Sequence, residues 1–214
     1  SGTDKSVFDS DQSTEVVWNY GTNSFKNTTY FFTSAYSETV PWSISTELLN
    51  QYGSNDLRRS VYFVRTFGSG EYGGKIGRNS SYGIRMAEAY LNRAEALARR
   101  FMAKGDGNDR VQALHDLNTL RETRYVDGTY VEEEIADAQD LLDFCLQERR
   151  LELCIEEGFR WFDIKRLGLS VTHKYIDSEG VEQEYVLESN SLLYALPIPY
   201  DAIERNYKLK QNPR

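Results

Sequence analysis

One charged and aromatic stretch, residues 140–168, constrains the fold of this chain more than any other. Its sequence is DLLDFCLQERRLELCIEEGFRWFDIKRLG. Apolar residues recur in it at steps of three and four positions, which predicts a helix with a single buried stripe. We expect Gly158 to end that helix, because glycine tolerates the left-handed conformation of a helix cap. A second, short helical turn is expected to follow and to close before Gly168.

The glutamates of this stretch admit a structural and a catalytic interpretation. Glu148, Glu152 and Glu156 are spaced four residues apart beside several arginines. Ion pairs at this spacing on a helix are usually solvated and stabilise it by only about 0.2–0.5 kcal/mol each. A catalytic pair would need a cleft and a shifted pKa, and the sequence shows neither. We therefore expect a packed corner with ion pairs at its rim, and we expect no enzymatic activity.

Composition excludes some classes of partner. The net charge of −8 repels phosphate backbones, so nucleic-acid binding is not expected. The sequence contains no run of 18 apolar residues, so no membrane-spanning helix is expected. His115 and His173 each lack a second histidine or a cysteine at ligand spacing, so neither a metal nor another cofactor is expected. Cys145 and Cys154 would stand roughly 13 Å apart along one helix, too far for a disulfide.

The first part of the chain, residues 1–81, is expected to consist of loops and short elements rich in aromatic side chains. Within it, several rings fall in a loop-like segment. Such rings can stack on the faces of pyranose sugars, or they can pack the loop onto neighbouring helices, and both interpretations stay open at this point. The residues concerned are Tyr30, Phe32, Tyr36 and Trp42.

The second part, residues 82–214, predicts a mainly helical body. An alanine-rich apolar stripe from Tyr82 to Phe101 favours a long helix that another helix can approach closely. Val111, Leu114, Leu117 and Leu120 mark a second, antiparallel helix, and the pair is typical of a tetratricopeptide-like helical hairpin. Two extended runs joined by DSEG predict a small β-hairpin at about 171–187. The expected fold class is mainly α, with irregular loops, and the two parts are expected to form one compact unit.

Three segments, in order, resemble the signature of the SusD/RagB family, the surface nutrient-binding lipoproteins of Bacteroidetes. ERRLELCIEEGFRWFDIKRLG is similar to the central pattern of the family. YGIRMAEAYLNRAEALARR, followed by LNTLRETR, resembles the family's helix pair, and LPIPYDAIERNYKLKQNP resembles its closing segment. Tyr207 departs from the family pattern, which usually has a proline there. Together the matches extend from Tyr82 to Pro213.

The resemblance implies a SusD-like helical body and a function in polysaccharide utilization. It implies carbohydrate binding at the cell outer membrane, with an oligosaccharide or other nutrient ligand passed to a SusC-like TonB-dependent transporter. It also implies that 214 residues are the C-terminal part of a longer lipoprotein, whose signal peptide and lipidated cysteine are absent from this fragment. In the family, the sequence between the first extended segment and the next helix is variable and borders the ligand face. The resemblance therefore makes the rings in that segment the expected ligand contacts: Tyr30, Phe32, Tyr36 and Trp42.

Two other functions compete with glycan binding. The chain could be a structural or docking module, with ligand binding confined to a missing N-terminal part. A glycoside hydrolase would need two carboxylates facing each other across a cleft at about 5–10 Å. The charged residues here lie mostly on amphipathic helices with local partners, so hydrolysis ranks last.

Overall fold

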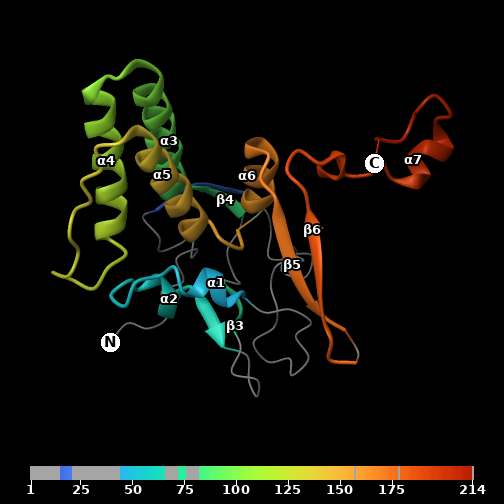
Figure 1. Cartoon of the computed structure of the whole chain (residues 1–214), viewed down its shortest axis with the longest axis horizontal. Helices are drawn as coiled ribbons and strands as arrows, with labels where there is room; N and C mark the ends of the chain where they lie inside the picture. The colour runs from blue at the N-terminus through green and yellow to red at the C-terminus, as the bar shows by residue number, and fades with distance from the viewer. Residues whose placement is uncertain are drawn as a thin grey trace. The chain divides into compact units, whose positions relative to one another are not determined.

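The computed structural model describes residues 15–20, 44–65, 72–75, 82–156, 158–177 and 179–213 (Figure 1). The chain divides into two units, Ser1–Glu157 and Gly158–Arg214, which are described separately below. The division expected between residues 81 and 82 stays a prediction. The mainly helical fold with small two-stranded sheets is confirmed.

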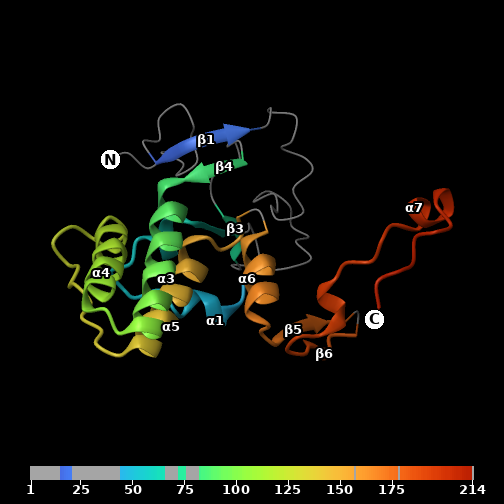
Figure 2. The same ribbon diagram turned by 90° about the horizontal axis from the view of Figure 1, so that it is seen from above.

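The first unit is built around three long helices. Helices α3 (Met86–Lys104) and α4 (Gly107–Glu122) form an antiparallel hairpin, and α5 (Ala138–Glu152) packs along α3 (Figure 2). Gly105 adopts a φ of 71° at the end of α3, a conformation that glycine takes without strain, and Asp106 caps α4 through the backbone N–H of Asn108. The buried alanines of α3 let the helices approach closely: Ala87, Ala94 and Ala98.

Short elements complete the first unit. Helix α1 (Thr46–Leu49) has Ser45 as its N-cap, and the Ser45 hydroxyl accepts from the N–H of Leu48 at 3.2 Å. Helix α2 (Arg58–Val61) follows, and strands β2 (Phe63–Arg65) and β3 (Tyr72–Lys75) pair antiparallel. An apolar cluster joins this region to the end of α5. Its buried members are Ile44, Leu48, Leu49, Tyr52, Tyr62, Phe63, Leu151 and Cys154.

The long helix of the hairpin begins later than the sequence predicted. Residues Tyr82–Arg85 form strand β4, which pairs antiparallel with β1 (Val16–Tyr20). Ile84 therefore lies on a strand and is exposed, although the periodicity had placed it in the helical stripe. Glycine at position 83 lowers helix propensity, and the partner strand supplies the backbone hydrogen bonds that a helix would have supplied.

The predicted end of the central helix at Gly158 is wrong. Helix α5 ends at Glu152, with Leu153 as its C-cap, and Ile155 adopts a φ of 55°. Leu153 and Cys154 instead turn into the core, where both are buried. Gly158 is the N-cap of the next helix, α6 (Phe159–Leu167), so it starts a helix of the second unit. Packing of the residues after Glu152 overrides a periodicity that continues past it.

The second unit begins with α6 and continues into the predicted β-hairpin. Strands β5 (Val171–Ile176) and β6 (Glu182–Leu187) pair antiparallel without a bulge, and the turn between them contains Gly180 at a φ of 80°. A 3-10 turn, η2 (Leu192–Tyr194), and helix α7 (Tyr200–Arg205) follow. None of the helices in the described ranges combines the length and the apolar character of a membrane span.

Both cysteines are buried and neither forms a disulfide, but they do not lie on one helix. Cys145 is on α5, and Cys154 lies beyond its end, with its Sγ 3.3 Å from the hydroxyl of Tyr52. Burial raises the pKa of the Cys145 thiol to about 12. We expect Ellman's reagent to label the native chain slowly and to titrate two thiols after unfolding without reductant. Fast labelling of the native chain would contradict the buried positions.

Candidate functional site

Two glutamates on the inward face of α5 form the centre of the most elaborate polar arrangement among the described residues. Glu148 and Glu152 are separated by one helical turn, and both are 0% exposed. They share that face with Leu141 and Cys145, so the apolar stripe of the helix is interrupted by two carboxylates. Buried carboxylates require charged or hydrogen-bonding partners, and both have them.

Arg58 of α2 reaches both glutamates. Its Nε and Nη2 donate to Asp56 at 3.0 and 2.7 Å, and its Nη1 donates to Glu148 at 2.5 Å and to Glu152 at 3.2 Å. The side chain is only 1% exposed in spite of its charge. A planar guanidinium suits this geometry because it presents several donors in a fixed fork.

Two further arginines converge on Glu152 from other elements. Arg85, at the end of β4, donates to Glu152 at 3.1 Å and to Glu156 at 2.7 Å. Arg124, just after α4, donates to Glu152 at 2.9 Å. Both arginines also pair with Glu15, next to β1. One carboxylate thereby connects segments that lie far apart in the sequence.

Arg121 of α4 holds the other glutamate. It donates to Glu148 and lies between aromatic rings whose centroids are 4.9–5.8 Å from its guanidinium carbon. These rings belong to Tyr125, Tyr130 and Phe144. We call the whole arrangement the central ion network; it comprises Arg58, Arg85, Arg121, Arg124, Asp56, Glu15, Glu148, Glu152 and Glu156.

The central ion network corrects the expectation of solvated ion pairs at the rim of a corner. Its two main carboxylates are buried, and their partners come from α2, β4 and the end of α4, not from the next turn of α5. Sequence reasoning missed Arg58, Arg121 and Arg124. A signal existed, since Arg121 and Arg124 are three residues apart on one predicted helix while Glu148 and Glu152 are four apart on another.

The electrostatics of the network favour a structural role over acid–base chemistry. Burial alone would raise the pKa of Glu152, but the guanidiniums of Arg124, Arg85 and Arg58 hold it well below its ordinary value. A carboxylate that remains charged near neutral pH is a poor proton donor. In the described ranges, no group of three or more His, Cys, Asp and Glu side chains could hold a metal ion.

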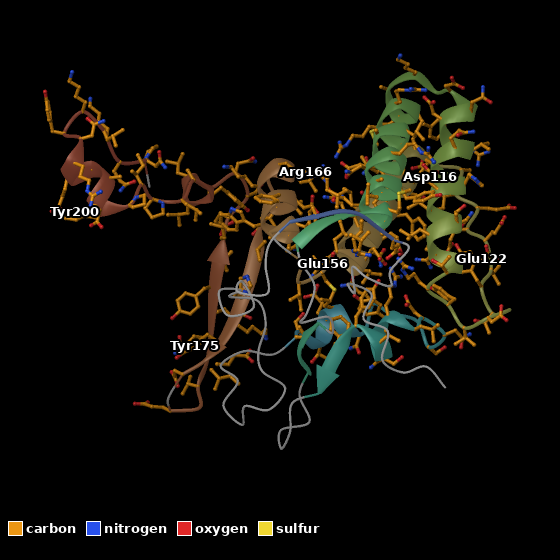
Figure 3. The ribbon with its side chains drawn as sticks, turned by 180° about the vertical axis from the view of Figure 1, so that it is seen from behind. Asp116, Glu122, Glu156, Arg166, Tyr175 and Tyr200 are labelled. Atoms are coloured by element: carbon orange, nitrogen blue, oxygen red, sulfur yellow. The ribbon has the colours of Figure 1, made fainter. Side chains whose placement is uncertain are left out.

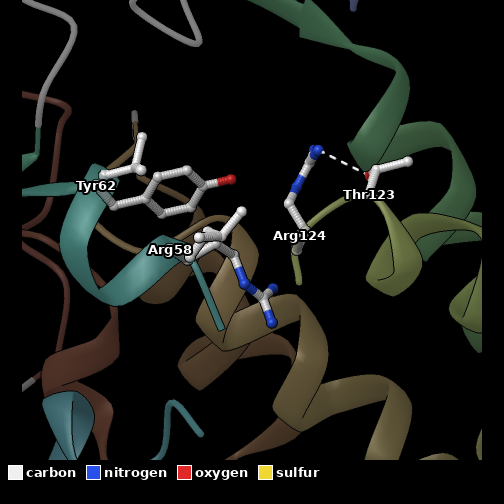
Figure 4. Close-up of a pocket in the computed structure, with 6 residues that line it drawn as sticks. Arg58, Tyr62, Thr123 and Arg124 are labelled. Carbon is white, nitrogen blue, oxygen red and sulfur yellow. Dashed lines mark hydrogen bonds between the residues drawn. The ribbon is translucent and has the colours of Figure 1, made fainter. Parts of the chain in front are cut away.

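A small hollow adjoins the network (Figure 4). It is lined by Leu57, Arg58, Val61, Tyr62, Thr123 and Arg124, and Arg124 donates to the Thr123 hydroxyl at 3.0 Å. Its volume of about 160 Å³ is well below the roughly 300 Å³ at which small-molecule sites begin. An oligosaccharide does not fit there, so the hollow is not the glycan site.

The four sequence-predicted ligand contacts, Tyr30, Phe32, Tyr36 and Trp42, lie outside the described residues. Their assignment stays a prediction.

A family model described as the SusD family matches residues 11–214. This chain belongs to the SusD family. Members of the family are non-catalytic binding proteins. A SusD-like protein of Formosa agariphila is 34% identical over 90 residues, which make up 41% of this chain and 17% of that protein.

Solved SusD-like structures share the fold. A SusD-like carbohydrate binding protein from Bacteroides vulgatus superposes with a TM-score of 0.60 at 21% identity, over 94% of this chain and 49% of the other. A SusD superfamily protein from Parabacteroides distasonis gives a TM-score of 0.53 at 19% identity, over 78% of this chain and 41% of the other. This chain therefore spans less than half the length of either solved relative.

The low pKa of Glu152 predicts acid sensitivity. The folded chain keeps this carboxylate charged at pH values where the unfolded chain takes up a proton. The stabilisation is therefore fully present above the ordinary value of 4.5, and it is lost as pH falls from there towards the lower folded pKa. Urea unfolding between about pH 7 and about pH 3 should show this loss, and Glu152→Gln should reduce the slope. An equal slope in the variant would contradict the assignment.

Proposed function

We propose that this chain binds a neutral or weakly charged oligosaccharide at the bacterial cell surface and delivers it to a SusC-like TonB-dependent transporter. The observation that carries the proposal is the match to the SusD family over residues 11–214. The carbohydrate binding named for the Bacteroides vulgatus relative supports the ligand class. Location at the outer-membrane surface, as part of a lipoprotein, belongs to the same proposal.

The proposed mechanism is binding without bond cleavage. Rings of Tyr30, Phe32, Tyr36 and Trp42 would stack on pyranose faces, and nearby polar groups would hydrogen-bond the hydroxyls. Affinity of this kind is modest, because ordering of ligand and side chains offsets much of the contact energy. A transporter partner makes such modest affinity useful. The central ion network is assigned a structural role and not a part in glycan binding, because its charges are already paired with one another.

Intrinsic tryptophan fluorescence, titrated against oligosaccharides from starch, plant cell walls and host mucin, tests the proposal. We expect a saturable response to one glycan class in the wild type and a Kd raised by about tenfold or more in the double variant Tyr36→Ala with Trp42→Ala. Tyr207→Ala is the matched control, because that ring is 88% exposed in the second unit. Trp42→Ala removes one of the tryptophans whose fluorescence is measured, so a lost signal need not mean lost binding. Calorimetry should therefore repeat any positive titration on the wild type and the double variant. A flat response to every glycan from a folded chain would contradict the proposal.

A second candidate is a structural or docking module whose ligand contacts lie elsewhere in the full-length protein. The observation in its favour is that the chain spans only 41–49% of the solved relatives. This candidate predicts transporter binding without any glycan response, so the same titration separates the two.

A further inference from the structure

The β5–β6 hairpin exposes side chains on both of its faces. Apart from the first and last positions, Val171 and Leu187, every side chain on the two strands is exposed. Tyr175 is 54% and Tyr185 63% exposed, and Figure 3 labels Tyr175 on this hairpin. Exposed aromatic rings that gather on one surface can mark a recognition site.

The register separates the side chains of the hairpin into two faces of different chemistry. Directly opposed residues share a face, and successive residues alternate between faces. His173 is opposite Tyr185 and Tyr175 is opposite Gln183, so these four share one face, here called the tyrosine face. The other face carries the charges: Lys174 pairs with Glu182 at 2.6 Å and with Glu184 at 3.6 Å.

The tyrosine face has no carboxylate, lysine or arginine at its four central positions. Tyr175 and Tyr185 are diagonal neighbours across the strands, a relation that places Cα atoms about 7–8 Å apart. His173 and Gln183 lie beside them and offer hydrogen-bond donors and acceptors. The face is thus uncharged, aromatic and bordered by polar groups, while all the formal charge on the strands is on the opposite side.

We propose that the tyrosine face is a second contact surface for neutral oligosaccharides. Tyrosine rings present flat apolar surfaces to the C–H groups of a pyranose and keep a hydroxyl in water. A neutral ligand matches an uncharged face because no ionised group loses its hydration on contact. This surface goes beyond the proposed function, which assigns binding to residues 30–42 of the first unit.

Fluorine NMR of the chain labelled with 3-fluorotyrosine locates the contact. Tyr175→Phe and Tyr185→Phe assign the two resonances. The probes are cellohexaose and maltoheptaose, with hexagalacturonate as the anionic comparison. We expect both resonances to shift together and saturably with at least one neutral probe and not with the anionic one. No shift with either neutral probe would overturn the proposal.

Calorimetry with the responding probe then measures the contribution of the face. We expect Tyr175→Thr with Tyr185→Thr to raise the Kd by about tenfold in the Tyr36→Ala and Trp42→Ala background. Threonine is chosen because it preserves β propensity. The matched control, Ile176→Thr with Val186→Thr, removes exposed apolar side chains from the charged face and should leave the Kd unchanged. Equal effects of both pairs would overturn the proposal.

The outcomes separate this proposal from the proposed function. Glycan binding that depends only on Tyr36 and Trp42, with silent hairpin resonances, would overturn the tyrosine face and leave the proposed function intact. Binding at the hairpin, unaffected by changes at Tyr36 and Trp42, would support the tyrosine face and remove the first assignment. Shifts that depend on protein concentration, without glycan, would instead assign the face to a second copy of the chain and overturn the proposal.

Discussion

Replacing Glu152 by glutamine should lower the free energy of unfolding by about 3–5 kcal/mol, the usual result of removing one partner from a buried ion pair. The substitution preserves size and leaves Arg58, Arg85 and Arg124 facing a neutral amide. It also weakens the acceptor for Tyr62, whose hydroxyl donates to Glu152 at 2.8 Å. Denaturant unfolding followed by circular dichroism measures the change. A loss of this size is a large fraction of the stability of an ordinary domain.

Glu184→Gln is the control for the Glu152 variant. Glu184 is exposed on the hairpin, and its carboxylate lies 3.6 Å from Lys174 in water. Exposed pairs of this kind contribute little to stability, so the control should unfold almost as the wild type does. Equal stability of the Glu152 variant and this control would show that the central ion network does not hold the first unit together.

Arg58→Met should destabilise the chain by a similar amount, about 3–5 kcal/mol. Methionine fills much of the volume of the arginine side chain but removes the donors that neutralise Asp56, Glu148 and Glu152. These acids then remain close together with fewer counter-charges. Thermal and denaturant unfolding at neutral pH measure the effect, and lower pH should reduce the difference from the wild type because protonation relieves the repulsion.

Arg59→Met tests whether the effect belongs to the buried position. Arg59 is the next residue on α2 and is exposed, so the same chemical change occurs on the same short helix. We expect little change in stability. If Arg59→Met were as harmful as Arg58→Met, loss of helix propensity or of net charge would explain both results, and the network would not be needed.

Much of the fold could be predicted from local sequence patterns. The alanine-rich stripe and the apolar spacing of residues 111–120 predicted the α3–α4 hairpin, because helices that pack together show this periodicity in their own sequence. The β5–β6 hairpin followed from two extended runs around DSEG. In each case the cause lies within a few residues of the element.

The end of α5 and the burial of its glutamates could not be predicted in this way. The helix stops at Glu152, and Cys154 just beyond it packs into a core made by residues 44–63, about a hundred positions away. The partners of Glu148 and Glu152 likewise come from distant elements. The charged face of this helix was therefore predicted to be exposed to solvent, although it is buried. Figure 3 labels Glu156, the carboxylate of the network that pairs with Arg85 at 2.7 Å.

The ligand contacts rest on family resemblance and on the chemistry of aromatic rings. Tyr30, Phe32, Tyr36 and Trp42 stay predictions, because they lie outside the part of the chain that the structure describes. The described part shows a structural network whose charges pair with one another and a neighbouring hollow too small for an oligosaccharide.

Calorimetry on paired variants tests whether the region of the central ion network and the glycan-binding surface are separate parts of the chain. The glycan with the strongest fluorescence response is titrated into the wild type, into Val61→Ala with Thr123→Ala at the hollow, and into Tyr36→Ala with Trp42→Ala. We predict an unchanged Kd for the hollow variant and a Kd raised by about tenfold or more for the aromatic variant. Loss of binding in a folded hollow variant, with normal binding in the aromatic variant, would contradict this prediction.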